Sequence, residues 1–203
     1  MNAFRSIRPV CIIGLFLAGA GVSPAVQAQF NPLSAIGSVV TTAADARTKD
    51  DVTSDLGILT DAKKRLFDDS KIESKGISLL VFGRHVVAAG AVKDEEMKKR
   101  ITDLMKQDKR IRSFNNELVV VKKAGDDGSF VGDTVIEEKI NATLTATKGV
   151  SSINMRWKSV NGTVVLMGVA RTKDEAALAV KEARGVGGVK SVKSYLRVVP
   201  AKS

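Results

Sequence analysis

Val164-Val165-Leu166-Met167-Gly168 is an apolar strand closed by a glycine, and Val86-Val87-Ala88-Ala89-Gly90 repeats the pattern 78 residues earlier. The offset also holds on both sides of these strands. The matched apolar pairs are Ile58 and Ile136, Leu66 and Leu144, Leu118 and Leu196, and Val120 and Val198. Solenoid units are shorter, at about 20 to 47 residues. The sequence therefore predicts one small domain used twice.

Each repeat shows the periodicities of a helix, a hairpin, a second helix and a strand, in that order. In the first repeat we expect helices at 55–67 and 94–106 and strands at 77–82, 85–89 and 114–121; in the second, helices at 133–146 and 172–184 and strands at 154–160, 163–168 and 190–199. Asn161-Gly162 is a strong hairpin signal, and Asp133 is expected to cap the first helix of the second repeat. Two helices can cover one face of a three-stranded sheet. The predicted class is α+β, with two tandem two-layer sandwich domains, each a three-stranded mixed sheet covered by two helices.

The first 28 residues have the pattern of a secretory signal peptide. Arg5 and Arg8 precede an apolar run at 10–20, and Val26-Gln27-Ala28 is a small-x-small cleavage signal. We expect a mature, periplasmic protein that begins at Gln29. The alternative is an uncleaved anchor.

The sole cysteine, Cys11, lies inside the apolar run and not at the cleavage point. We therefore expect no lipid anchor, and a mature chain without disulfides or thiol chemistry. The predicted layout is a signal peptide at 1–28, a flexible segment at 29–53, a first domain at 54–123, a linker at 124–130 and a second domain at 131–200.

The chain is basic, with a net charge of +10, and both repeats share the excess. In an exported protein such a surface suggests anionic lipid headgroups or acidic envelope polymers as partners. Export separates the protein from nucleic acid, which we exclude as a partner. The alternative is a charged surface that serves solubility alone.

Nothing in the sequence predicts an active site. His85 is the only histidine, so it cannot form an acid–base pair or a multi-histidine metal site. The acidic groups at 94–96 and 126–127 lack the spacing of a calcium loop, and the Gly-x-Ser-x-Gly motif is absent. We expect no enzyme activity, no cofactor and no metal.

Gly90 and Gly168 are expected to act through the backbone, because a side chain would clash where the chain leaves the sheet. Gly185, Gly187 and Gly188 follow a helix and are expected to end it. Trp157 is the only tryptophan. Core packing is its expected role, and an exposed platform flanked by cations is the alternative.

The stretch from Asn161 to Val192, NGTVVLMGVARTKDEAALAVKEARGVGGVKSV, resembles the BON domain (bacterial OsmY and nodulation). The first copy is less similar, with Asp108-Lys109-Arg110-Ile111 at the place of the glycine-rich turn. The resemblance implies a non-enzymatic envelope or osmotic-stress module that binds phospholipid or envelope proteins. It further implies lipid contact on the first helix of the second copy, where Val135 takes the position of an aromatic residue.

The helix at 133–146 carries a second stripe beside its buried one. With two residues just upstream, this stripe gives the candidate lipid-binding residues: Phe130, Val131, Val135, Lys139 and Ala142. A position flanking the core explains these residues equally well, and Glu137 and Glu138 add negative charge to the same helix. The leading hypothesis is a periplasmic protein that associates with anionic membranes. The alternative is a soluble periplasmic chaperone or adaptor that holds proteins through an open sheet edge or groove.

Overall fold

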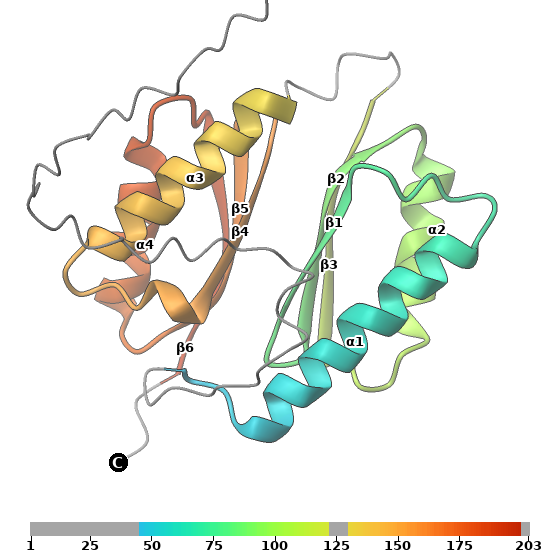
Figure 1. Ribbon diagram of the computed structural model, residues 1–203, viewed down its shortest axis with the longest axis horizontal. Helices are drawn as coiled ribbons and strands as arrows, with labels where there is room; N and C mark the ends of the chain where they lie inside the picture. Colours follow the sequence, from blue (N-terminus) through green and yellow to red (C-terminus); the bar gives the residue numbers. More distant parts are fainter. Residues whose placement is uncertain (1–44, 122–129, 200–203) are drawn as a thin grey trace, which may run out of the picture. The chain divides into compact units, whose positions relative to one another are not determined.

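The computed structural model describes residues 45–121 and 130–199, all within one compact unit, Ser38–Ser203. These residues form four α-helices and two three-stranded mixed sheets, an α+β fold (Figure 1). The predicted signal peptide, most of the predicted N-terminal segment and nearly all of the predicted linker lie outside them.

Both repeats have the predicted order of elements. The first consists of α1 (Lys49–Asp68), β1 (Ile77–Phe82), β2 (His85–Val92), α2 (Glu95–Lys106) and β3 (Ser113–Val120). The second consists of α3 (Phe130–Ala146), a 3-10 turn η2 (Ser152–Asn154), β4 (Met155–Val160), β5 (Thr163–Ala170), α4 (Lys173–Gly185) and β6 (Ser191–Val198).

The two sheets have the same topology and the same register. The middle strand, β2 or β5, pairs antiparallel with the strand before it and parallel with the strand that follows the second helix. Gly90 stands opposite Leu118, and Gly168 stands opposite Leu196. The 78-residue offset therefore holds in three dimensions.

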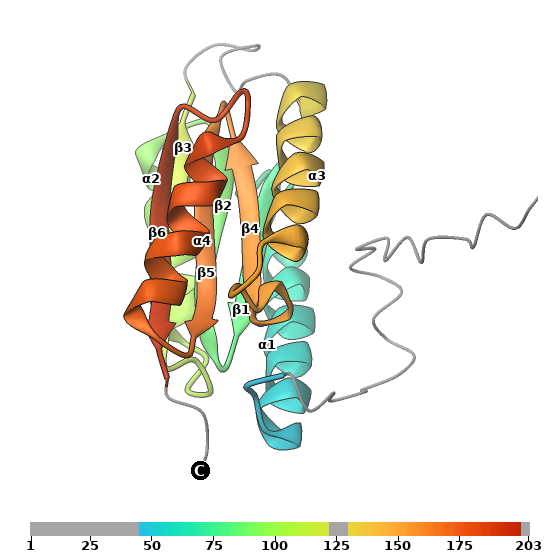
Figure 2. The ribbon, with the colours of Figure 1, turned by 90° about the vertical axis from the view of Figure 1, so that its left-hand side faces the viewer.

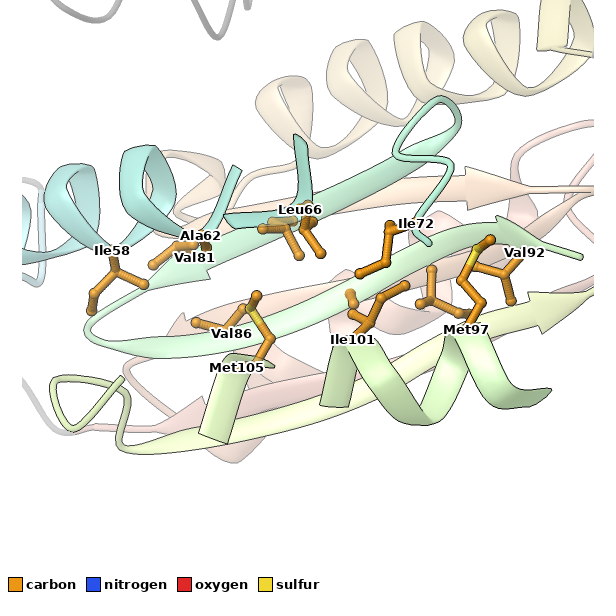
Figure 3. Packing of buried hydrophobic residues seen from close by; sticks show 13 residues of the cluster. Ile58, Ala62, Leu66, Ile72, Val81, Val86, Val92, Met97, Ile101 and Met105 are labelled. Atoms are coloured by element: carbon orange, nitrogen blue, oxygen red, sulfur yellow. The ribbon is translucent and has the colours of Figure 1, made fainter. Parts of the chain in front are cut away.

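The helices of each repeat cover one face of its own sheet (Figure 1). In the first repeat Ile58, Ile101 and Met105 of the helices are fully buried against strand residues such as Val86 (Figure 3). In the second repeat α3 lies along β4, and α4 lies across β5 and β6 (Figure 2). Each buried Ile, Leu or Met stabilises the fold by about 1.5 to 3 kcal/mol, so these two cores hold the repeats together.

The opposite faces of the two sheets share a third core. Its buried members are Phe82, Val87 and Ala89 of the first repeat and Val165, Met167 and Val169 of the second. A two-layer sandwich would leave this face of each sheet in water. Here the two repeats bury it together.

Two expectations about α1 are wrong in detail. The helix begins at Lys49 and not at Asp55, because Thr48 caps it by accepting a hydrogen bond from the backbone N–H of Asp51. Phe67, which falls near helical spacing with Ala62 and Leu66 and is therefore expected on the apolar face, is 80% exposed at the end of the helix. The strands β2 and β5 also continue two residues beyond their glycines.

Candidate functional site

The candidate lipid-binding residues all lie on α3. Phe130 and Val131 are in its first turn, and their side chains lie outside the described part of the structure. Val135 is 41% exposed, and Lys139 and Ala142 are exposed as well. The stripe beside it is buried, and consists of Ile136, Ile140 and Leu144. The helix thus presents one apolar and weakly basic face to solvent.

The carboxylates of α3 contribute little negative charge to this face. Glu137 turns toward the sheet, where its Oε1 lies 2.8 Å from Lys158 Nζ and accepts a 3.0 Å hydrogen bond from the backbone N–H of Ser159. Asp133 is buried. Of the acidic residues on α3, only Glu138 remains exposed.

Trp157 packs in the core of the second repeat. Its ring is partly buried in the cluster beneath α3, and its Nε1–H donates a 3.1 Å hydrogen bond to the backbone carbonyl of Glu137. The hydrogen bond fixes the ring against the helix. The core-packing interpretation of Trp157 is therefore confirmed, and an exposed platform is excluded.

The equivalent face of α1 is covered. At the 78-residue offset, Gly57 stands where Val135 stands on α3, and Asp61 stands where Lys139 stands. Arg110 lies across this face: its Nη2 is 2.6 Å from Asp61 Oδ2, and its Nη1 is 3.1 Å from the place of a Cβ on Gly57. In the second repeat Gly188 takes the position of Arg110 and has no side chain to cover α3.

Each repeat holds its hairpin turn with a buried carboxylate that sequence reasoning missed. Asp133 is not the cap of α3, which begins three residues earlier. Its carboxylate accepts hydrogen bonds from Ser159 Oγ (2.6 Å) and from the backbone N–H groups of Asn161 (2.7 Å) and Gly162 (2.9 Å). Burial raises the pKa of Asp133, but these hydrogen bonds outweigh it and lower the pKa below its ordinary value.

Asp55 binds the turn of the first repeat in the same way, accepting from the backbone N–H groups of Gly83 (2.7 Å) and Arg84 (2.6 Å). Asp55 and Asp133 are matched at the 78-residue offset. An aspartate at the same position of two otherwise apolar helix stripes was the signal in the sequence that could have predicted this shared role.

Gly90 and Gly168 lie where their strands closely approach the backbone of a neighbouring strand. Their φ angles are +139° and +133°. A Cβ on Gly90 would lie 2.1 Å from the carbonyl oxygen of Gly76, and one on Gly168 would lie 2.1 Å from that of Asn154. The close approach is therefore to the start of the antiparallel partner strand, and not to the exit toward the next helix as expected.

Polar contacts join the two repeats around the third core. Glu117 of β3 accepts a hydrogen bond from the Tyr195 hydroxyl and pairs with Lys193 Nζ at 2.5 Å. The hydrogen bond to Glu117 raises the pKa of Tyr195 to about 12. Near Phe82, the guanidinium groups of Arg47 and Arg156 lie 4.6 Å and 5.4 Å from the ring centroid.

His85 serves the fold: its Nδ1 lies 2.6 Å from Ser113 Oγ, and burial, with Arg197 and Arg112 nearby, lowers its pKa. Residues 45–121 and 130–199 contain no cluster of three or more His, Cys, Asp or Glu side chains able to hold a metal. No helix in the described part of the chain is long and apolar enough to span a membrane.

Residues 132–200 match the model of the BON domain. The second repeat thus matches the family that its sequence resembles. It is similar to the osmotically-inducible protein Y of Escherichia coli (strain K12), with 28% identity over 144 residues, 70% of this chain and 72% of that protein. It is also similar to an uncharacterized protein in the gshII 5′ region of Anaplasma centrale, with 28% identity over 148 residues, 73% of this chain and 97% of that protein. Both alignments are longer than one repeat.

Among solved structures, the chain is similar to CdsD, a structural protein of the type III secretion system of Chlamydia trachomatis. The TM-score is 0.31 at 18% identity, covering 72% of this chain and 64% of that chain. The CdsD C-terminal domain gives a TM-score of 0.30 at 18% identity, covering 71% of this chain and 66% of that chain. The chain spans less than two thirds of either solved chain.

Proposed function

We propose that this protein is a non-enzymatic, periplasmic osmotic-stress protein of the cell envelope that contacts anionic phospholipid through α3 of its second repeat. Its similarity to the osmotically-inducible protein Y and its BON-domain match support the envelope-stress role. The signal-peptide pattern at 1–28 supports export.

The uncovered face of α3 is the observation that carries the lipid-binding part of the proposal. Val135, Lys139 and Ala142 are exposed together on α3, whereas Arg110 covers the equivalent face of α1. Two helices with the same place in the fold thus differ in what they offer to a partner. The second repeat supplies the surface.

The charges near this face favour an anionic partner. The carboxylate of Glu137 pairs with Lys158 and accepts a hydrogen bond from a backbone N–H. Lys139 therefore has one exposed acidic neighbour on the helix, Glu138. A lysine near an anionic membrane surface contributes about 1 kcal/mol, and salt screens that attraction. We therefore expect peripheral, reversible and salt-sensitive binding.

Co-sedimentation of the mature protein with vesicles tests the proposal. Phosphatidylglycerol-containing vesicles should sediment the protein at low salt, and pure phosphatidylcholine vesicles should not. Raising the salt concentration should release it. Binding to neither kind of vesicle at any salt concentration would refute the lipid-binding part and leave the osmotic-stress role to rest on similarity alone.

A further inference from the structure

A groove lies between α4 and β6, on a different part of the second repeat from the exposed face of α3. Its volume is about 550 Å³, and its lining residues are Ala176, Ala177, Val180, Lys181, Arg184, Gly185 and Ser194. Its lining residues are small or apolar except for Lys181 and Arg184, which are exposed, and none of them is acidic. Such a groove has room and charge for an anionic segment.

The first repeat closes the same place with one side chain. Asn116 of β3, the equivalent of Ser194, donates through Nδ2 to the backbone carbonyl of Lys98 (2.9 Å) and to Thr102 Oγ1 (2.8 Å) on α2. Asn116 thereby spans the space between strand and helix. In the second repeat Val180 takes the position of Thr102, and Ser194 is too short to reach across.

The difference between Asn116 and Ser194 also affects the edge strand of each sheet. Among the described residues β6 pairs only with β5, so alternate N–H and C=O groups of β6 point outward. The N–H of Leu118 on β3 is occupied by Asn116 Oδ1 at 3.1 Å, whereas its counterpart on Leu196 has only a 3.4 Å contact with Ser194 Oγ. The edge of β6 therefore keeps its capacity to bind a further strand.

We propose that the α4–β6 groove binds an extended, acidic segment of another exported protein, which adds a strand to the free edge of β6. The backbone groups of β6 would supply affinity, and Lys181 and Arg184 would select acidic side chains. A second copy of this chain is disfavoured as the occupant, because its net charge is +10. The inference is independent of the proposed contact between α3 and lipid.

Fluorescence anisotropy with a labelled peptide that alternates valine with aspartate tests the proposal on the mature full-length protein. A matched peptide that alternates valine with lysine is the control probe. The wild-type protein should bind the acidic peptide. The double variant Lys181→Glu/Arg184→Glu should bind it about tenfold or more weakly at low salt. Lys139→Glu on α3 is the matched charge control and should leave peptide binding unchanged.

Ser194→Asn, combined with Val180→Thr, transfers the closed arrangement of the first repeat to the second. Because the first repeat tolerates this pair of residues, the variant should fold, which its thermal melt will show. The variant should bind the acidic peptide about fivefold or more weakly than the wild type does, and its binding to phosphatidylglycerol vesicles should be unchanged. The peptide should also slow hydrogen exchange at the outward amides of β6, including those of Ser194 and Leu196.

Equal binding of the two peptides, or full binding by the closed variant, would overturn the proposal. Slowed exchange on α3 in place of β6 would also overturn it. A variant that loses vesicle binding but keeps peptide binding would separate the two surfaces and support both assignments.

Discussion

The two repeats share one backbone plan and differ in two places where a side chain closes a surface. In the first repeat Arg110 lies across α1 and Asn116 fills the space between α2 and β3. In the second repeat Gly188 and Ser194 take these positions and leave α3 and the α4–β6 groove open. Strand register and core packing are common to both copies, whereas Arg110 and Asn116 close surfaces of the first copy that stay open in the second.

The glycines test the shared plan and should give the largest effect. Gly90→Val and Gly168→Val each place a branched side chain at a positive φ, with a Cβ 2.1 Å from a backbone oxygen. Each variant should lose about 3 kcal/mol of stability or more. Thermal melts followed by circular dichroism and by the fluorescence of Trp157, the only tryptophan, will measure both. A Gly168→Val protein with the wild-type melt would contradict the assignment, and unequal losses would show that one repeat supports the other.

The buried carboxylates come next. Asp55→Asn and Asp133→Asn should each destabilise the protein by about 1 to 3 kcal/mol at neutral pH, because each hairpin turn loses a charged acceptor. Hydrogen bonds lower the pKa of Asp133 in the folded state. The stabilisation from Asp133 is therefore fully present above the unfolded-state pKa of about 4 and is lost as pH falls through the folded-state pKa. Urea unfolding across pH should show the Asp133→Asn deficit shrinking in acid, and a constant deficit would argue against the hydrogen-bonded carboxylate.

The open and covered helices differ in a binding measurement. Lys139→Glu should weaken binding to phosphatidylglycerol vesicles by about tenfold at low salt and flatten the salt dependence. Val135→Trp should strengthen binding by adding an amphipathic ring. Lys63→Glu on α1 is the matched control and should have a smaller effect. Equal effects of Lys63→Glu and Lys139→Glu in vesicle titrations would indicate diffuse electrostatic attraction in place of a contact through α3.

The contact between the repeats should give the smallest effect. Glu117→Gln should lower the pKa of Tyr195 from about 12 toward its ordinary value, since the acceptor loses its charge. Absorbance titration is specific here because Tyr195 is the only tyrosine. Because the pKa is raised in the folded state, the bond stabilises the protein below about pH 10, and this contribution is lost as pH rises through 12. Tyr195→Phe should lower the stability of the protein by about 1 kcal/mol. An unchanged tyrosine titration in Glu117→Gln would show that the Tyr195 hydroxyl does not bind Glu117.

The internal repeat made most of the fold predictable. Apolar periodicity, the Asn161-Gly162 turn and the 78-residue offset gave the order of elements and the buried stripe of α3. The face of each sheet in the third core could not be assigned, because β2 and β5 are apolar on both faces and alternation therefore gives no direction.

The site was predictable only in part. The stripe of Val135, Lys139 and Ala142 followed from helical spacing, and the structure places it in solvent. The roles of Arg110 and Asn116 did not follow, because a long side chain that crosses to another element leaves no periodic signal. The partner of Glu137 depends on the register of α3 against β4, which local sequence does not fix.

Glu117 and Tyr195 are separated by 78 residues and therefore occupy the same position in the two copies. In an association of two identical single-repeat chains, a residue at such a self-facing position would meet its own duplicate. Two glutamates would repel one another, and two tyrosines would lack a charged acceptor. Because the two copies are joined in one chain, the two positions can carry different residues. A carboxylate and a phenol can therefore form a hydrogen bond that two identical residues could not form.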